Sequence, residues 1–563
     1  MAPRGPESGR LTVNVGTDRR APPEDRETTR TIVVLMVVVG MLVGTALVAS
    51  EFIPPPTVPS GPHYLPPVNA TINTFALSGA TPIPSSFWGI NVGAGNPFTL
   101  AEARLLATTP VTYIRYPGGD PADEMNYTTG IITNKTGVTY PAGTPPAQFV
   151  DSCEAIQCHA ILGLPAEIDS PSTAAYYVSY VEQTLHFTPA YWEIGNEPSA
   201  WNHYDQPWSE WATAPPNPVN ISEYTSLLFN YSEAVRSVDP TTPLIAPALG
   251  ESGIGKSCAT WCGPVVSADG SLLGAVSVHS YPAFPPTASR SLTSFFSLLR
   301  TSAYALPTVV PADRGYIQRS YSGYLPLFVD EISTVPTTQN GEGAFANYTG
   351  ELYGGLFDAA EVTQLLALDV ANADWFDWAS VDSYSWDGSG NGPLTPTGMI
   401  FQTFMPLLYS EYDPTIVVTP STLYASATTD GTHLSLLVVN VNTTTPAAFP
   451  LSGLFSGAVE ETTWANGTGI ASAPVLNTTA EALPLSVSVW RGEAGAQLTS
   501  AALHSTARSR SLPAQTSTTR LGSPALPGST VIGHSTSLVA QGPMARTRRG
   551  VRCFHPQVRR RPV

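Results

Sequence analysis

The sequence contains very little lysine and few charges of either sign. Only Lys135 and Lys256 are lysines among its 563 residues, and charged residues make up 12% of the chain. Six of the 26 lysines and arginines precede residue 31 and eleven lie at or after Arg491, which leaves nine for the long central part. Because contacts to phosphate depend on Lys and Arg, this distribution argues against a nucleic-acid partner.

Cysteine is also scarce, with five residues in the whole chain. Four of them form close pairs, Cys153 with Cys158 and Cys258 with Cys262, and Cys553 stands alone. In an exported chain the four would form two local disulfides or one crossed pair of bridges. Zinc is the alternative, but one histidine lies beside these pairs and no second follows at ligand spacing. We predict no metal site, and no cofactor motif is seen.

One apolar run, residues 32–49, is long enough for a minimal membrane span. Segment 1–31 before it is rich in arginine, so the positive-inside rule predicts a cytoplasmic N-terminus and an exported remainder. A cleaved signal peptide is the alternative, since Ala49 is small and a proline-rich stretch follows. The long flank favours an uncleaved anchor in the cell membrane, with the globular part extracellular, or secreted if the segment is cleaved.

Nine N-x-Ser/Thr sequons follow the apolar run, and they can be glycosylated only outside the cytoplasm. They support export and predict a glycoprotein. The sequons begin at Asn69, Asn126, Asn134, Asn220, Asn230, Asn347, Asn442, Asn466 and Asn477.

Short apolar, β-rich runs alternate with segments of helical spacing through residues 69–412. Strands that alternate with helices imply a parallel sheet, and eight such units imply a closed (β/α)8 or TIM barrel of the α/β class. The eight runs begin at residues 87, 111, 159, 191, 243, 275, 325 and 373.

Three segments flank the predicted barrel. Residues 413–494 contain close-spaced alternating strands and predict a small antiparallel β-sandwich, to which 69–82 could add a strand. Residues 50–68 form a proline-rich spacer, which would be stiff and extended. Residues 495–563 are rich in Ser, Thr and Arg without apolar periodicity, which predicts a disordered tail.

The active site of such a barrel lies at the C-terminal ends of its strands. Two carboxylates on different strands, with Arg, Asn and aromatic residues around them, suit the hydrolysis of an acetal. One carboxyl donates a proton to the leaving oxygen while the other attacks or activates water. The strand-end residues are Arg115, Asn196, Glu197, His279, Tyr281, Asp330, Glu331, Trp375 and Trp378.

The segment WEIGNEPSAW, residues 192–201, resembles strand four of the clan-A retaining glycosidases. It is most similar to the heparanase and β-glucuronidase, β-xylosidase and arabinofuranosidase families. The resemblance implies that Glu197 is the general acid/base and that Asn196 binds the substrate 2-hydroxyl. LPLFVDEIST at 325 matches strand seven and implies that Glu331 is the nucleophile. By strand alternation, we expect Asp330 to point away from the barrel axis.

Three further segments resemble the same families. IRYPGGD at 114 is similar to strand two, which implies that Arg115 bonds the nucleophile and lowers its pKa. VHSYP at 278 is similar to strand six, so His279 and Tyr281 would line the site and the tyrosine would contact the nucleophile. WFDWAS at 375 would supply a platform tryptophan, either Trp375 or Trp378, and we favour Trp378.

The resemblance covers residues 64–490 and implies a retaining glycoside hydrolase that acts on a carbohydrate. It leaves the sugar, the linkage and the oligomeric state open. The alternative is a noncatalytic carbohydrate-binding or cell-envelope protein on a glycosidase-like barrel, since a fold does not fix an activity.

Overall fold

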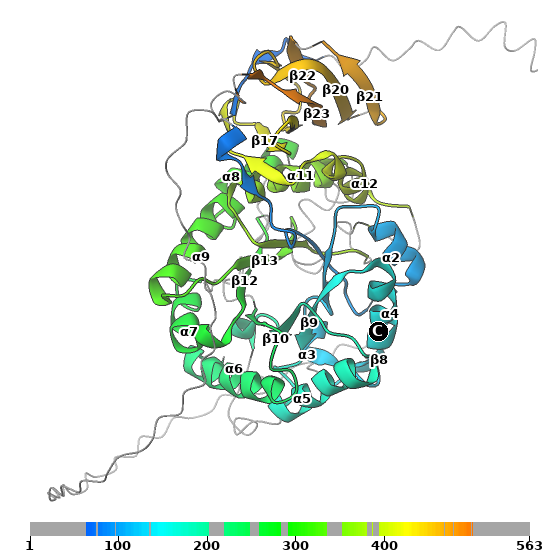
Figure 1. Ribbon diagram of the computed structural model, residues 1–563, viewed down its shortest axis with the longest axis vertical. Helices are drawn as coiled ribbons and strands as arrows, with labels where there is room; N and C mark the ends of the chain where they lie inside the picture. The colour runs from blue at the N-terminus through cyan, green and yellow to red at the C-terminus, as the bar shows by residue number, and fades with distance from the viewer. Residues whose placement is uncertain are drawn as a thin grey trace, which may run out of the picture. The chain divides into compact units, whose positions relative to one another are not determined.

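The structure is a computed structural model (Figure 1). The described residues are 64–498, with gaps at 75–76, 96, 134–136, 202–218, 248–257, 283–290, 335–351, 380–385, 387–392, 467, 477 and 497. Segment 1–31, the apolar run 32–49, nearly all of the spacer and nearly all of the tail lie outside them. Among the described helices, none is both long and apolar enough to span a membrane.

Eight parallel strands close into a barrel, and each of the eight predicted runs supplies one of them (Figure 1). The predicted fold class is therefore confirmed. Around the ring, each strand pairs with the next in chain order, and the last pairs with the first. The strands are β4 (Trp88–Asn91), β5 (Tyr113–Tyr116), β9 (His159–Leu164), β10 (Tyr191–Ile194), β11 (Leu244–Ala246), β12 (Ala275–Ser280), β13 (Leu327–Ile332) and β14 (Asn372–Trp375).

Helices surround the barrel and bury apolar residues in its main core. In α6 (Ile221–Arg236) this face includes Tyr224, Leu228 and Val235. The helix begins with a capping box: the Asn220 side chain accepts from the Glu223 amide, and the Glu223 carboxylate accepts from the Asn220 amide. The other helices are α2 (Leu100–Leu106), α3 (Pro121–Glu124), α4 (Pro146–Ile156), α5 (Pro171–Ser179), α7 (Cys262–Asp269), α8 (Leu292–Thr301), α9 (Leu306–Ser320), α11 (Leu352–Ala367) and α12 (Pro396–Thr403).

Shorter elements connect these parts. A small sheet joins β6 (Met125–Asn126), β7 (Ile131–Thr133) and β8 (Thr139–Pro141) between α3 and α4. One π-helical turn, η2 (Tyr180–Thr184), continues α5. The 3-10 turns are η1 (Leu77–Gly79), η3 (Pro198–Ala200), η5 (Gly270–Leu272) and η6 (Met405–Leu407).

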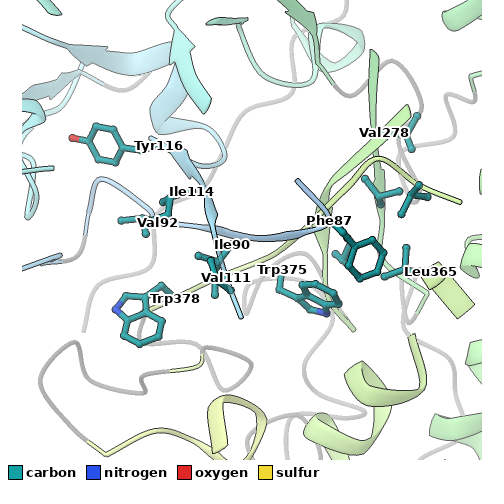
Figure 2. Packing of buried hydrophobic residues seen from close by; sticks show 14 of the residues in the cluster. Phe87, Ile90, Val92, Val111, Ile114, Tyr116, Val278, Leu365, Trp375 and Trp378 are labelled. Atoms are coloured by element: carbon teal, nitrogen blue, oxygen red, sulfur yellow. The ribbon is translucent and has the colours of Figure 1, made fainter. Parts of the chain in front are cut away.

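The main hydrophobic core lies between the barrel strands and the helices. Figure 2 shows part of it, where Phe87 and Ile90 of the first barrel strand region pack near Trp375 and Trp378. The Trp375 ring stacks on Trp88 at 6.2 Å and meets Phe401 of α12 edge-on at 4.7 Å. These aromatic contacts fix the end of β14 against the first strand.

A second core belongs to an antiparallel domain after the barrel, as the sequence predicts. Segment 69–82 also takes part, because β2 pairs with β16 and β3 pairs with β15. The seven-stranded sheet has the order β21-β20-β23-β18-β17-β15-β3, and smaller sheets join β1-β19-β22 and β16-β2. The strands are β1 (Val68–Asn69), β2 (Thr71–Thr74), β3 (Thr81–Pro82), β15 (Glu411–Asp413), β16 (Thr415–Thr419), β17 (Leu423–Thr429), β18 (His433–Asn440), β19 (Ala447–Pro450), β20 (Phe455–Ala465), β21 (Ala471–Val475), β22 (Thr479–Ala482) and β23 (Ser486–Ala494).

The second domain packs on the helices of the barrel. Arg300 of α8 donates to the Tyr424 hydroxyl at 3.0 Å, and its guanidinium lies 4.5 Å from the centre of that ring. Ser426 of β17 donates to the Thr363 carbonyl of α11 at 3.0 Å. A cavity of about 360 Å³ lies between α8 and the β17 region, away from the strand ends that carry the candidate site.

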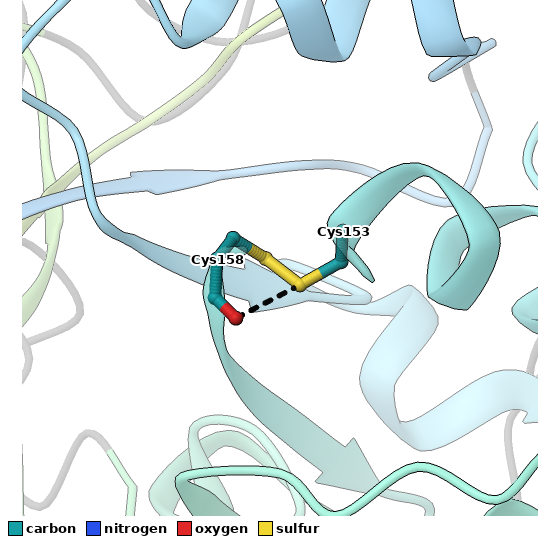
Figure 3. The surroundings of a disulfide bond; sticks show 2 residues. All are labelled: Cys153 and Cys158. Carbon is teal, nitrogen blue, oxygen red and sulfur yellow. Dashed lines mark hydrogen bonds between the residues drawn. A yellow bond between two sulfur atoms is a disulfide. The ribbon is translucent and has the colours of Figure 1, made fainter. Parts of the chain in front are cut away.

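Both close cysteine pairs form local disulfides. Cys153 lies in the last turn of α4, and Cys158 directly precedes β9 (Figure 3). The Cys153–Cys158 bridge therefore ties a helix to the strand that follows it. The crossed pairing, the alternative that the sequence leaves open, does not form.

Candidate active site

A sharp turn after β10 places Asn196 and Glu197 at the barrel mouth. Gly195 adopts φ +83°, which favours glycine, and a Cβ on this residue would lie 2.5 Å from the Trp201 ring. Glu197 itself adopts φ +47° and directly precedes the turn η3. The side chain of Glu197 keeps 22% of its surface exposed, so it can reach a bound molecule.

Asp123 of α3 holds this turn in place. One of its carboxylate oxygens accepts from the Asn196 amide at 2.9 Å and from the Trp201 indole at 3.1 Å. The other oxygen accepts from the amides of Ala166 and Glu167, both at 3.1 Å. A single buried carboxylate thus joins the ends of β9 and β10.

Glu331 lies near the end of β13, on the opposite side of the mouth from β10. Val278 of β12 pairs with Val329, but His279 pairs with Glu331, so one extra residue is inserted in β13. This residue is Asp330, and such a bulge changes the direction of side chains along a strand. The carboxylates of Asp330 and Glu331 lie 3.8 and 2.7 Å from the Arg115 guanidinium. The expectation that Asp330 points away from the axis was wrong because the bulge interrupts the alternation.

Arg115 of β5 connects the two sides of the site. Its Nη1 donates to Glu331 Oε1 at 2.7 Å and to Asn91 Oδ1 at 3.0 Å. Its Nη2 donates to Asn196 Oδ1 at 2.8 Å, and its Nε donates to Glu193 Oε2 at 2.6 Å. The guanidinium is fully buried, so these hydrogen bonds fix its orientation.

His279 and Tyr281 approach the two glutamates from β12 and the residue that follows it. The Tyr281 hydroxyl donates to Glu331 Oε2 at 2.5 Å. The His279 Nδ1 lies 2.7 Å from Glu197 Oε1 and 3.3 Å from Glu331 Oε2. Burial opposes charge on this ring, but the Glu331 and Glu197 carboxylates outweigh it and raise the pKa of His279 to about 9.

One carboxylate oxygen of Glu197, one of Glu331 and a ring nitrogen of His279 all lie within 4.8 Å of one another. By type and distance these groups could hold a metal ion. However, Arg115 and Tyr281 already occupy one Glu331 oxygen each, which leaves that carboxylate little capacity for an ion. Burial, together with the nearby Glu197, holds the pKa of Glu331 above its ordinary value, although His279, Arg115 and Tyr281 each lower it. The arrangement therefore suits a carboxylate held in place by cations and a phenol.

Phe376 is a further aromatic residue beside Glu331. A Cβ built on Gly119 would lie 3.3 Å from the Phe376 ring and 3.9 Å from Glu331 Oε1, so the ring and the carboxylate flank the same glycine. Phe376 is partly exposed. Trp375 and Trp378 are each 1% exposed and belong to the hydrophobic core (Figure 2). There the Trp378 ring meets Phe98 edge-on at 6.5 Å. The described structure brings together the other predicted site residues but does not bring Trp378 to them.

Sequence reasoning missed four residues with a part in this site. Asn91 ends β4, and a Cβ on Gly118 would lie 2.6 Å from its side-chain oxygen, so this glycine makes room for it. Asn91 and Phe376 lie inside segments that were recognised as strands, and their position at the strand ends was the available signal. Asp123 and Glu193 gave no signal, because their partners lie far away in sequence.

The fold and the site together define a class of protein. Its members are parallel barrels that carry one glutamate at the end of the fourth strand and one at the end of the seventh. No protein-family model and no curated protein matches the sequence. Solved structures do match. The α-L-arabinofuranosidase from Thermotoga maritima, in complex with arabinose, has a TM-score of 0.59 and 16% identity, covering 76% of this chain and 100% of its own.

Two other similar structures have glucan-related names. A xyloglucanase from Paenibacillus polymyxa has a TM-score of 0.58 and 14% identity over 76% of this chain and 100% of its own. A bifunctional glucanase-xylanase from a metagenome library has a TM-score of 0.58 and 13% identity over 77% of this chain and 100% of its own. Because the identities are low, the similarity shows that this chain shares a fold with these three proteins.

Proposed function

We propose that this protein is a retaining glycoside hydrolase with Glu331 as nucleophile and Glu197 as general acid/base. The observation that carries the proposal is the separation of the two carboxylates, which bring one oxygen each within 4.8 Å. Retaining glycosidases hold their carboxyl groups about 5 to 5.5 Å apart, whereas inverting enzymes leave about 6.5 to 9.5 Å for a water molecule. The short separation supports direct attack by one carboxylate.

In the first step, a Glu331 oxygen forms a bond to the anomeric carbon while the bond from that carbon to the leaving oxygen breaks. Glu197 transfers its proton to the leaving oxygen and becomes a carboxylate. In the second step, Glu197 takes a proton from water, and the water oxygen displaces Glu331 from the anomeric carbon. Two inversions restore the original configuration, and both glutamates return to their starting states.

The neighbouring residues have separate roles in these steps. Arg115 and Tyr281 hold the two Glu331 oxygens in position for attack. Asn196 would bind the sugar 2-hydroxyl, and its own side-chain oxygen accepts from Arg115. His279 contacts Glu197 and sets the position of its carboxylate. Phe376, rather than Trp378, offers the ring that a sugar could contact beside Glu331.

The substrate class is an O-linked oligosaccharide or polysaccharide. The structural neighbours are named for activity on arabinofuranosides, xyloglucan, glucan and xylan. We therefore propose a panel of aryl arabinofuranoside, xyloside, glucoside and glucuronide, followed by xyloglucan and xylan. Hydrolysis of one glycoside well above the others would assign the sugar.

The mechanism is tested with Glu331→Gln and Glu197→Gln, with the exposed Glu154→Gln as matched control. Glu331→Gln should lose nearly all turnover on every substrate, because no group remains to form the glycosyl-enzyme. Glu197→Gln should keep much of the first step on substrates with activated leaving groups, and azide should rescue it with a glycosyl azide of retained configuration. An inverted first product in proton NMR, or full activity of Glu331→Gln, would refute the assignment.

A noncatalytic carbohydrate-binding protein is the second candidate. It would bind sugars through the same mouth without turnover of any glycoside. Sugar binding measured by calorimetry, alongside hydrolysis of the panel, separates the two candidates.

We also propose that the protein is exported and tethered by residues 32–49, on the strength of the apolar run and its arginine flank. Protease added to intact cells should then release the barrel. Protection of the barrel equal to that of a cytoplasmic marker would refute this topology. Edman sequencing of the purified protein would identify a cleaved signal peptide instead.

The domain boundaries are proposed from sequence patterns and have their own test. Deletion after about residue 495 should leave activity and folding intact, because the tail lacks a core-forming pattern. Deletion after about residue 412 should instead make the protein insoluble, since it would expose the helices that β17 covers. Equal behaviour of the two truncations would contradict the boundaries.

A further inference from the structure

Two buried carboxyl groups, Glu193 of β10 and Asp330 of β13, lie beside the Arg115 guanidinium. The Nε of Arg115 lies 2.6 Å from Glu193 Oε2 and 3.8 Å from Asp330 Oδ2. Neither carboxyl side chain has any exposed surface. Neither belongs to the proposed pair of catalytic groups, so their presence needs a separate explanation.

The charges around Arg115 do not balance if every carboxyl is ionised. Glu193, Asp330 and Glu331 all face the same guanidinium, and all three are almost completely buried. A buried carboxylate without a full counter-charge is costly, and such a group retains its proton instead. The titratable groups around Glu193 and Arg115 are Asp330, Glu331, His279, Asp374 and, from the surrounding helices and sheet, Tyr127 and Tyr224.

The positions of the cations decide which carboxyl keeps the proton. Asp330 lies near two of them, with Arg115 Nε at 3.8 Å and His279 Nε2 at 3.4 Å. Glu193 accepts one hydrogen bond, from Arg115 to Oε2, and its Oε1 has no donor among the described residues. Glu193 and Asp330 are neighbours, and both Asp330 oxygens also lack a donor among the described residues, so a proton on Glu193 Oε1 supplies the hydrogen bond that neither carboxyl otherwise has. Burial, together with Asp330, raises the pKa of Glu193 well above its ordinary value.

We propose that Glu193 is a protonated positioning residue that accepts from Arg115 Nε through Oε2 and donates to Asp330 through Oε1. Asp330 then carries the single negative charge of this carboxyl pair. Held by its Nε, the Arg115 guanidinium presents Nη1 to Glu331 and Nη2 to Asn196. The kinetic consequence rests on the proposed glycosidase function, whereas the protonation of Glu193 does not.

Three variants test the kinetic consequence. Glu193→Leu removes both hydrogen bonds, so Arg115 can shift and kcat should fall at least about 100-fold, with a smaller change in KM. Glu193→Gln should recover most of that loss, because its amide oxygen can accept from Arg115 and its amide N–H can donate to a carboxylate. Asp330→Asn should lose at least about tenfold in kcat, because it removes the negative charge of the pair.

The opposite ranking would overturn the proposal. If Glu193→Gln were as damaging as Glu193→Leu while Asp330→Asn kept wild-type kcat, Glu193 would be the ionised member. Circular dichroism and thermal unfolding of all three variants show whether they fold. The pH profile of kcat/KM adds a second criterion. If Glu193 is neutral, Glu193→Gln should not shift the pH at which kcat/KM declines on the acid side.

Infrared spectroscopy tests the proton without any substrate. A protonated carboxyl has a carbonyl stretch that is separate from those of a carboxylate, and the wild-type minus Glu193→Gln difference spectrum at neutral pH should contain it. Lack of that band would refute a protonated Glu193 even in an active enzyme. If the wild-type protein hydrolyses no glycoside, the proposed function fails, but the same spectrum still decides the protonation of Glu193.

Discussion

The Nδ1 nitrogen of His279 lies 2.7 Å from the Oε1 oxygen of Glu197, although the two residues are 82 positions apart in sequence. The barrel places the ends of β10 and β12 close together, so a histidine from one strand supports a glutamate from the other. The same nitrogen is 3.3 Å from Glu331. A protonated His279 therefore places positive charge beside both glutamates and offsets the negative charge of Glu331.

The charge on His279 makes stability depend on pH. The pKa of His279 is raised from 6.5 to about 9, so the folded protein binds this proton more tightly than the unfolded chain does. This stabilisation is fully present below pH 6.5 and is lost as pH rises through about 9. His279→Gln should unfold at a lower temperature at pH 6 and show a flatter curve from pH 6.5 to 9 in calorimetry. A parallel, uniformly shifted curve would contradict a charged His279.

Removal of the Tyr281 hydroxyl should slow attack by Glu331. Tyr281→Phe keeps the ring but loses the hydrogen bond of 2.5 Å to the nucleophile, so kcat should fall about 10- to 100-fold. The glycosylation rate, followed by stopped flow, reports this step. Tyr127→Phe is the matched control, since it removes a buried hydroxyl that donates to the Gly163 carbonyl away from Glu331. Equal loss in both variants would indicate a general effect on folding.

The indole of Trp201 should matter for catalysis more than for folding. Trp201→Phe keeps a ring against Gly195 but loses the hydrogen bonds to Asp123 and to the Asn196 carbonyl. We expect kcat to fall about tenfold, because the turn that carries Glu197 becomes less fixed. Trp464→Phe removes one indole hydrogen bond in the second domain and serves as control. Wild-type kcat in Trp201→Phe would contradict the supporting role.

Asp358 and Glu361 should favour folding in acid. Both carboxyl groups are fully buried on α11, where burial raises the pKa of Asp358 from 3.8 to about 8 and that of Glu361 well above its ordinary value. The unfolded chain releases these protons near pH 4, so the free energy of unfolding falls as pH rises from 3.8 to about 8. The slope approaches about 1.4 kcal/mol per pH unit for each retained proton.

Asp358→Asn and Glu361→Gln should each remove the part of this slope that comes from the substituted carboxyl group. Thermal unfolding between pH 4.5 and pH 8.5 should show higher melting temperatures for both variants than for the wild type at the alkaline end. The exposed Glu481→Gln should follow the wild-type curve. Variants that are less stable than the wild type at pH 8 would indicate that both carboxyl groups are ionised in the folded protein.

Much of the fold and most of the site could be predicted because the strands end in recognisable residues. Arg115, Asn196, Glu197, His279, Tyr281 and Glu331 all follow or end apolar runs, and closure of the barrel brings them together. The resemblance implies a platform tryptophan, Trp375 or Trp378, but both are buried, whereas Phe376 between them is partly exposed. Asp123 and Glu193 depend on contacts between distant segments, which no local pattern records.

Because of the extra residue in β13, a substitution in a loop and a deletion in this strand have different effects on the site. The bulge, a property of the backbone register, turns both Asp330 and Glu331 toward Arg115. Substitutions in the loops that follow the barrel strands leave this register untouched. A one-residue deletion within β13 would instead restore simple alternation, so that Asp330 and Glu331 could no longer both face Arg115.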